Sequence, residues 1–318
     1  MKRITIGGAL NVSQVWLGML QLAQASVDQM TAMNVVTSSL SLGVSVFDCA
    51  REYGGHEIMA EVIESLGAHG KGELVIADKS RARSYEDMET AIAESLTELG
   101  CEQIGIYMLH DVRGREDFEL RTGAWRYLVE AKEMGLVHAI GISTRTVEGV
   151  KLAAEIDELD IVQAPFNEVG VGIFDGDIGA MERALELAKA KGKTICAFKV
   201  FGGGALFKRW KEALKFVLKH KCVDCICIGA TTSAEVRAVV SFLNQLESDS
   251  LAGYGLRQRI VIADWCISCG ICAQVCPTGA LVFREGSLQV DESTCTFCGA
   301  CIAACLEEAI FIVQVEQL

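Results

Sequence analysis

Two kinds of apolar pattern alternate along the first 250 residues of the chain. Short apolar runs rich in β-branched side chains are typical of buried strands, whereas apolar residues at spacings of three and four indicate amphipathic helices. The helical pattern is clear at 85–99 and at 181–190. The predicted strands are 15–19, 44–47, 74–77, 104–109, 137–142, 161–164, 194–198 and 224–228.

The order of these elements predicts the fold class. A regular alternation of strand and helix implies a parallel sheet. Eight such units in about 250 residues fit a closed TIM (β/α)8 barrel better than an open doubly wound sheet. We therefore predict an α/β barrel at residues 1–250 and a small C-terminal domain at 256–318, with the polar, glycine-containing segment 248–255 as the linker.

Seven polar side chains lie at or just after the ends of six of the predicted strands. They are Asp48, Tyr53, Lys79, His110, Ser143, Gln163 and Lys199. Taken singly, each is better explained as an ordinary loop or turn residue. In a barrel, however, the carboxyl ends of the strands meet at one face, where the chemistry of this fold takes place. All seven would then converge on one cavity, as acid–base chemistry requires.

Four of these residues, Asp48, Tyr53, Lys79 and His110, have complementary chemistry. A phenol with a pKa of about 10 delivers a proton to a developing alkoxide only when a neighbouring cation lowers that pKa. Lys79 can supply the charge, Asp48 can hold Lys79 in an ion pair, and His110 can orient the substrate oxygen. The set predicts a general acid for carbonyl reduction, or the corresponding base for alcohol oxidation.

The cysteine pattern C-x2-C-x2-C-x3-C occurs twice near the end of the chain. Two such runs hold two 4Fe-4S clusters in dicluster ferredoxins, where the fourth cysteine of each run binds the other cluster. A structural zinc site would need only one or two C-x2-C pairs. The predicted ligands are Cys266, Cys269, Cys272 and Cys305 for one cluster and Cys295, Cys298, Cys301 and Cys276 for the other. The chain is therefore predicted to pass electrons one at a time.

With these motifs in view, the barrel sequence resembles the aldo-keto reductases, and the whole chain resembles their ferredoxin-fused branch. The resembling motifs are FDCA (47–50) with Tyr53 and Gly54, DK (78–79), MLHD (108–111), IGIS (140–143), VQAPFN (162–167), FGGG (201–204) and IGAT (228–231). The resemblance implies a TIM barrel followed by a small bacterial-ferredoxin-like α+β domain. It also implies that Tyr53 donates the proton, Lys79 lowers its pKa, Asp48 pairs with Lys79, and His110 positions the substrate.

The resemblance also implies a nicotinamide site, which is matched less well. Ser143 and Gln163 would hold the carboxamide and Phe198 would stack beneath the ring. The family's asparagine after the serine is absent, because Thr144 and Arg145 follow Ser143. The sequence therefore leaves open whether NAD(P)H is a cofactor of this chain.

The region expected to bind the rest of a dinucleotide departs further from the family. After the last strand there is no lysine or arginine before Arg237 to pair with a 2′-phosphate. The amides at the helix start after Thr232 can still hold a phosphate. Glycines 202–204 replace the loop that covers the cofactor in many members, and we favour an ordinary tight turn there.

Composition and charge limit the kinds of partner that the chain is expected to bind. A net charge of −13 disfavours nucleic acid, whose phosphates need a basic surface. From residue 257 onward, seven acidic residues stand against three arginines, an excess that would attract basic redox partners. No apolar run is long enough for a membrane span. Eight of the fourteen cysteines are predicted cluster ligands, which suits a reducing, cytoplasmic location.

The amino-terminal stretch up to Gln24 loosely imitates a secretory signal, with Lys2 and Arg3 before an apolar segment. Polar residues, among them Asn11 and Gln14, interrupt that segment. Cleavage would also remove the first predicted strand. We therefore expect no leader here.

Three functions agree with these features. The first is an iron-sulfur oxidoreductase that acts on a carbonyl or alcohol, with ferredoxin or another redox protein as external carrier; dependence on NAD(P)H or on ferredoxin stays open. A direct relay between nicotinamide and clusters is poor, since one passes a hydride and the others single electrons. The second is a barrel enzyme without hydride transfer, either flavin-linked or catalysing elimination on a sugar-like alcohol. The third is an electron-transfer protein whose barrel is a scaffold.

Overall fold

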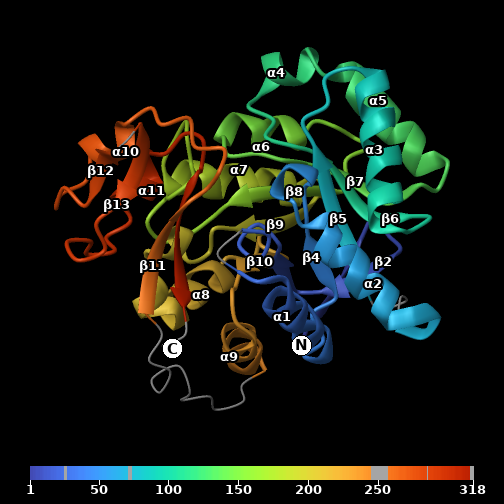
Figure 1. The fold of residues 1–318 in the computed structure, drawn as a ribbon. Helices are drawn as coiled ribbons and strands as arrows, with labels where there is room; N and C mark the ends of the chain where they lie inside the picture. Colours follow the sequence, from blue (N-terminus) through green and yellow to red (C-terminus); the bar gives the residue numbers. More distant parts are fainter. Residues whose placement is uncertain (25–26, 71–73, 245–256, 285, 316–318) are drawn as a thin grey trace.

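A computed structural model describes residues 1–24, 27–70, 74–244, 257–284 and 286–315 and contains a closed parallel barrel (Figure 1). The strands follow one another around the barrel in chain order, and the last pairs with the first. They are β3 (Val15–Gly18), β4 (Val46–Asp48), β5 (Val75–Ser80), β6 (Ile104–Leu109), β7 (Val137–Ser143), β8 (Ile161–Pro165), β9 (Thr194–Phe198) and β10 (Cys225–Gly229). All eight predicted strands are confirmed, with small shifts at their ends.

Helices surround the barrel (Figure 1). They are α1 (Gln29–Ser41), α2 (His56–Gly70), α3 (Tyr85–Leu99), α4 (Arg115–Glu119), α5 (Thr122–Glu133), α6 (Val147–Ala153), α7 (Ile178–Ala190), α8 (Trp210–Lys219) and α9 (Ser233–Leu243), with short 3-10 turns η1 (Arg51–Tyr53), η3 (Gly202–Gly204) and η4 (Phe207–Arg209). The predicted helix at 85–99 coincides with α3, which begins at a capping box of Ser84 and Asp87. In the part of the chain that the structure describes, no helix is long and apolar enough to cross a membrane.

A hairpin that the apolar pattern does not predict precedes the barrel. Its strands β1 (Arg3–Ile6) and β2 (Leu10–Ser13) pair antiparallel. Ile6 and Val12 are fully buried and pack with the side chains that fill the barrel interior. The turn of the hairpin lies against Asp160, the residue before β8. The hairpin therefore closes the amino-terminal end of the barrel and leaves the carboxyl end for a site.

The C-terminal domain has two antiparallel strand pairs and two short helices. They are β11 (Arg257–Ile262) with β14 (Ile310–Val315), β12 (Leu281–Arg284) with β13 (Ser287–Val290), and α10 (Ile271–Gln274) and α11 (Ala300–Ala304). Ile260, Leu281 and Ile310 belong to its own small core. The predicted linker, 248–255, lies outside the described residues, so the domain boundaries stay a prediction.

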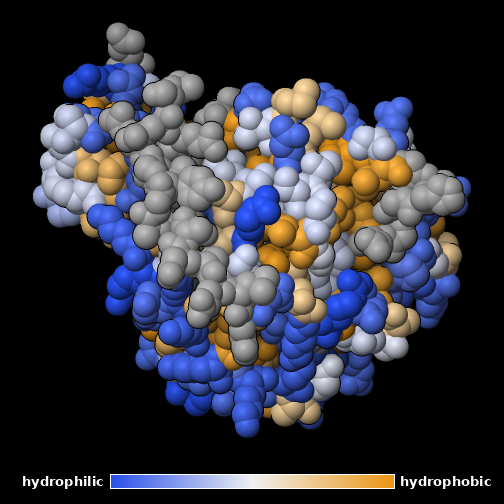
Figure 2. Space-filling model, turned by 90° about the horizontal axis from the view of Figure 1, so that it is seen from below, coloured by the Kyte–Doolittle hydropathy of each residue, from blue (hydrophilic) through white to orange (hydrophobic). Residues whose placement is uncertain are grey.

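The surface differs between the two parts of the molecule. On the face seen from below, hydrophilic residues cover most of the margin (Figure 2). Twelve large hydrophobic side chains are strongly exposed among the residues described, and half of them belong to the C-terminal domain: Trp265, Ile267, Ile271, Val275, Phe283 and Leu306. Exposed apolar side chains are therefore concentrated on the smaller domain.

Candidate active site

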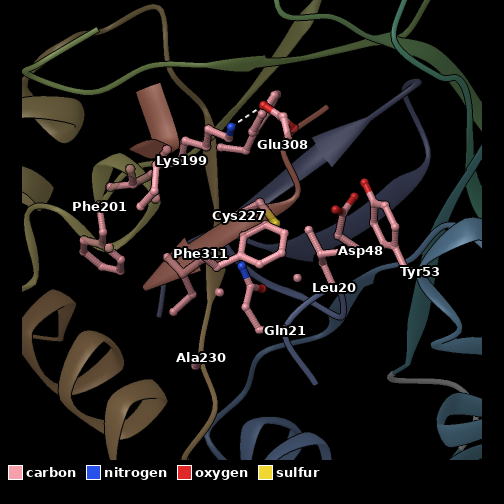
Figure 3. Close-up of a pocket in the computed structure, with 18 of the residues that line it drawn as sticks. Leu20, Gln21, Asp48, Tyr53, Lys199, Phe201, Cys227, Ala230, Glu308 and Phe311 are labelled. Carbon is pink, nitrogen blue, oxygen red and sulfur yellow. Dashed lines mark hydrogen bonds and ion pairs between the residues drawn. The ribbon is translucent and has the colours of Figure 1, made fainter. Parts of the chain in front are cut away.

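A cavity of about 160 Å³ lies at the carboxyl ends of the barrel strands, between the barrel and the C-terminal domain (Figure 3). What we call the barrel wall contains Asp48, Tyr53, Lys79, His110, Ser143, Gln163 and Phe198. What we call the C-terminal wall consists of Ile302, Glu308, Ile310, Phe311, Ile312 and Val313. The structure thus brings all the predicted catalytic and cofactor-binding residues to one cavity, and it adds a wall that the sequence does not predict.

Lys79 lies at the centre of the barrel wall. Its Nζ donates a hydrogen bond to Oδ1 of Asp48 at 2.9 Å and another to the carbonyl oxygen of Cys49 at 2.7 Å. The same Nζ lies 5.1 Å from the centroid of the Tyr53 ring. Gln163 donates through Nε2 to Oδ1 of Asp48 at 2.8 Å. Asp48 and Lys79 are therefore fixed relative to each other, next to the phenol.

Burial and neighbouring charges have opposite effects on the pKa values of Lys79 and Tyr53. Burial lowers the pKa of Lys79, but the attraction of Asp48 and Tyr53 outweighs it, so the pKa of Lys79 is raised. Burial raises the pKa of Tyr53, and Lys79 only partly offsets this effect. At neutral pH the cavity therefore holds a charged ammonium group beside a protonated phenol.

His110 follows β6 and faces Tyr53, with the two ring centroids 6.1 Å apart and the ring planes at 81°. Its Nδ1 lies 2.7 Å from Oγ of Ser143, and that oxygen accepts a hydrogen bond from the backbone N–H of Asp111 at 3.1 Å. Burial lowers the pKa of His110 well below its ordinary value, and Lys79, Arg81, Arg145 and Arg121 lower it further. The imidazole is therefore neutral, and in the tautomer that has its proton on Nε2, Nδ1 accepts a hydrogen bond from the Ser143 hydroxyl.

The segment after β6 contains three arginines. Arg113 and Arg115 have exposed side chains. Arg121 is buried, and it donates to the carbonyl oxygens of Ala82 at 3.1 Å and His110 at 2.9 Å. Arg121 therefore holds the backbone at the ends of β5 and β6.

The three residues expected at a nicotinamide, Ser143, Gln163 and Phe198, all line the cavity. Two of them, however, make internal hydrogen bonds: Ser143 with His110, and Gln163 with Asp48. Just before α9, the amides of Thr231 and Thr232 donate to Oε2 of Glu235 at 2.8 and 3.1 Å. An internal carboxyl group thus lies beside the helix start at which we expected that a phosphate could bind.

Glu308 of the C-terminal wall is held by two cations of the barrel. Nη1 of Arg145 lies 3.2 Å from its Oε1, and Nζ of Lys199 donates to the same oxygen. Arg145 also donates to both carboxylate oxygens of Asp111, at 2.9 and 2.8 Å. Burial raises the pKa of Glu308, but Lys199 and Arg145 lower it more strongly, so Glu308 is ionised. This ion cluster ties the loop after Cys305 to the carboxyl end of the barrel.

Arg145 and Glu308 were not predicted as a pair from the sequence. The available signal was Arg145 itself, since Thr144 and Arg145 follow Ser143 where the family has an asparagine. Lys199 was predicted only as one polar strand-end residue, without its partner in the other domain.

Glycines 202–204 form η3, the short turn on which the C-terminal domain rests. A Cβ on Gly204 would lie 2.7 Å from the backbone oxygen of Ile312, and one on Gly203 would lie 2.7 Å from Cγ2 of Ile302. Gly204 also has a φ of 101°, which side-chain-bearing residues rarely adopt. These glycines therefore permit close approach of the C-terminal domain in addition to forming the expected turn.

The predicted cluster ligands gather around two separate voids. Cys266, Cys269, Cys272 and Cys305 line one, and Cys276, Cys295, Cys298 and Cys301 line the other. Each group combines three cysteines of one run with the fourth of the other run. Four thiols around each void are the donor set that a 4Fe-4S cluster requires.

The two cysteine runs share an unusual backbone. Ser268 and Phe297, each two residues after the first cysteine of its run, have φ angles of 53° and 55°. Gly270 and Gly299, each one residue after the second cysteine, have φ angles of 81° and 79°. The same left-handed positions recur in both runs, so both form the same turn around their void.

Comparison with protein families matches residues 14–213 to the Aldo/keto reductase family and residues 265–309 to a 4Fe-4S dicluster domain. The chain is 28% identical over 180 residues to pyridoxine 4-dehydrogenase of Escherichia coli, covering 50% of this chain and 62% of the relative. It is 44% identical over 45 residues to a protein of the ion-translocating oxidoreductase complex of Methanosarcina acetivorans, covering 14% of this chain and 17% of the relative.

Among solved structures, an aldo-keto reductase from Bacillus halodurans in its holo form has a TM-score of 0.64 at 19% identity, covering 76% of this chain and 91% of that one. At this identity the likeness concerns the fold. The chain spans less than two thirds of the length of either curated relative. The first family match, in contrast, covers more than half of the chain. The chain therefore belongs to the aldo/keto reductase family of oxidoreductases, and it carries a C-terminal 4Fe-4S dicluster domain.

Proposed function

We propose that this chain reduces a carbonyl group or oxidises an alcohol, with Tyr53 as proton donor or acceptor and with electrons exchanged with an external carrier through iron–sulfur clusters. The observation that carries the proposal is the buried ammonium of Lys79 between Asp48 and the Tyr53 ring. A fixed cation beside a phenol favours the phenolate that forms when the proton leaves. The family and the relative named as a dehydrogenase support the same class of reaction.

In the reducing direction, Tyr53 donates its hydroxyl proton to the carbonyl oxygen as negative charge develops there. Burial keeps the pKa of Tyr53 high, so the phenol carries its proton before the reaction. Lys79 stabilises the phenolate that remains, and Asp48 keeps Lys79 in position. Alcohol oxidation follows the same path in reverse, with Tyr53 as the base.

His110 positions the substrate oxygen. With Ser143 bonded to Nδ1, the neutral ring presents its Nε2 proton to the cavity. A neutral donor aimed at the carbonyl oxygen stabilises developing charge without adding a competing acid. Its ring lies beside that of Tyr53, so both side chains can contact the same substrate oxygen.

The C-terminal domain fits two clusters, held by Cys266, Cys269, Cys272 and Cys305 and by Cys295, Cys298, Cys301 and Cys276. When bound, such clusters supply electrons one at a time at low potential. The exposed apolar side chains of this domain support ferredoxin or another redox protein as the carrier.

The test is Tyr53→Phe in the full chain, reconstituted anaerobically. Reduced ferredoxin and NADPH are each supplied as donor, with a panel of small aldehydes, ketones and conjugated carbonyls. We expect kcat to fall at least about 10²-fold with either effective donor, since general acid catalysis contributes about 10²–10⁴. Absorbance near 400 nm, which reports the clusters, is expected to stay unchanged.

Tyr85→Phe is the matched control, because Tyr85 lies at the start of α3 and its hydroxyl bonds to Glu130. This variant is expected to keep full turnover. Wild-type turnover in Tyr53→Phe, with product confirmed by mass spectrometry, would contradict the proposed role.

A further inference from the structure

We infer that the C-terminal domain occupies the groove in which this barrel would hold a nicotinamide dinucleotide, so that a one-electron carrier, and not NAD(P)H, reduces the chain. The inference rests on the proposed function, because it names the electron donor of the same site. Four observations support it.

First, the polar groups expected to hold the cofactor have internal partners. Ser143 bonds to His110, and Gln163 bonds to Asp48. The carboxyl group of Glu235 accepts hydrogen bonds from the amides of Thr231 and Thr232, just before α9. A phosphate that bound these two amides would have to displace the Glu235 side chain.

Second, the space is too small. The cavity of about 160 Å³ is close to the roughly 150 Å³ that accommodates a benzene molecule in a protein core. Pockets for larger ligands range from about 300 to 1,000 Å³. Phe311, Ile312 and Val313 fill part of the groove, with Ile312 in contact with Gly204. A dinucleotide could enter only if the C-terminal domain moved away.

Third, the C-terminal domain supplies its own anion to the groove. Lys199 and Arg145 are the kind of cations that would pair with a cofactor's phosphates. Both are instead paired with Glu308. Arg145 is further fixed by two hydrogen bonds to Asp111, so it is not available to turn toward another ligand. Glu308 therefore takes the place of an external anion.

Fourth, one cysteine group lies next to the cavity. Ile310 lines both the cavity and the void surrounded by Cys266, Cys269, Cys272 and Cys305. The Ile310 residue thus borders both this void and the substrate space. No carrier has to enter the cavity for electrons to reach it from this side.

This arrangement limits the substrate. Only a molecule of about one ring fits the cavity. Reduction adds two electrons and two protons to the C=O group: Tyr53 gives one proton to oxygen, solvent gives the other, and two molecules of reduced one-electron carrier are oxidised. Since the electrons arrive singly, the half-reduced carbonyl must be stabilised. We therefore expect a carbonyl conjugated with a second acceptor, as in a quinone or a 1,2-dicarbonyl.

The test is direct binding of NADPH and NADH to the reconstituted full chain, measured by calorimetry and by nucleotide fluorescence up to about 1 mM. We expect no saturable binding, and no bleaching near 400 nm on addition of either nucleotide. Reduced ferredoxin is expected to bleach the clusters, and a small quinone is expected to restore the absorbance.

Saturable binding of either nucleotide by the wild-type chain below about 0.1 mM overturns the inference, whatever the turnover. This outcome differs from failure of the proposed function. If the nucleotide binds and Tyr53→Phe still abolishes turnover, the proposed function stands and the inference falls. If no nucleotide binds and Tyr53→Phe turns over normally, the inference stands and the role of Tyr53 falls.

Discussion

The two walls of the cavity differ in the kind of contacts that their residues make. On the barrel wall, a hydrogen-bonded ion pair of Asp48 and Lys79 lies beside the Tyr53 ring, and His110 is held by Ser143. On the C-terminal wall, Glu308 and the strand β14 fill space with contacts between two domains. The first wall has the residue types that proton transfer needs. The second has contacts that hold one domain against the other.

Under the function proposed above, the acid–base residues and the electron supply are separable parts of the site. Asp48 and Lys79 pair within the barrel, so a change of electron donor would leave this pair in place. The C-terminal domain fills the groove next to these residues. Arg145 and glycines 202–204, at which the chain departs from the family, are residues that contact this domain.

The largest expected effect comes from breaking the barrel wall. In Lys79→Met, the phenolate of Tyr53 loses its stabilising cation, and Asp48 keeps only its bond from Gln163. We expect kcat to fall about 10³-fold or more, because fixed charges at a reacting group contribute on this scale. The measurement is turnover with a reduced one-electron carrier, together with the absorbance near 400 nm, which is expected to stay at the wild-type level.

Lys189→Met is the control for this variant. Lys189 is partly exposed and pairs with Asp224 on the outer side of the barrel, so its loss is expected to leave turnover unchanged. A circular dichroism melt of both variants separates a loss of catalysis from a loss of fold. Equal turnover in Lys79→Met and wild type would contradict a catalytic role of this wall.

Much of the barrel wall could be predicted from the sequence. Buried parallel strands have continuous apolar runs, and each predicted catalytic residue stands at or shortly after the end of such a run. Because the strands of a barrel all end at one face, their order along the chain is enough to bring Asp48, Lys79 and His110 together. The residue types then indicate the chemistry.

The C-terminal wall could not be predicted in the same way. Glu308 is one of several acidic residues in its domain, and nothing local distinguishes it from a solvated one. Its partners, Arg145 and Lys199, are more than 100 positions away along the chain and belong to the other domain. The hairpin β1–β2 was also missed, because its strands have only 4 residues each and form no continuous apolar run.

A second prediction breaks the contact between the walls through Gly204→Ala. The new methyl group would meet the Ile312 backbone at 2.7 Å, and the residue would keep a φ of 101°. Strain and overpacking each cost about 1–3 kcal/mol, so we expect a loss of about 3 kcal/mol in the free energy of unfolding. Denaturant unfolding followed near 400 nm and by circular dichroism measures it.

Gly192→Ala is the matched control for Gly204→Ala. Gly192 also has a positive φ, 83°, but a Cβ there would meet no atom within 4 Å. Only the backbone strain remains, which we expect to cost about 1 kcal/mol. Equal losses in the two variants would mean that the contact with Ile312 contributes nothing to holding the domains together.

The smallest effect is expected from Glu308→Gln, which removes the charge from the ion cluster but keeps its shape. We expect a loss of about 1.5–3 kcal/mol at pH 7, typical of a hydrogen bond to a charged group. Lys199 and Arg145 hold the pKa of Glu308 below its ordinary value in the folded chain. The stabilisation is therefore fully present above the unfolded pKa of about 4.3, and it is lost as the pH falls through the lower folded pKa.

The pH dependence of stability tests whether the effect of Glu308→Gln comes from the charge of Glu308. The difference in melting temperature between wild type and Glu308→Gln is expected to be constant from pH 8 to about 5 and to shrink below about 4. Glu168→Gln is the control, because Glu168 pairs with the exposed Arg209 and such pairs contribute about 0–1 kcal/mol. A difference that does not shrink in acid would show that the shape of the Glu308 side chain, and not its charge, holds the C-terminal wall against the barrel.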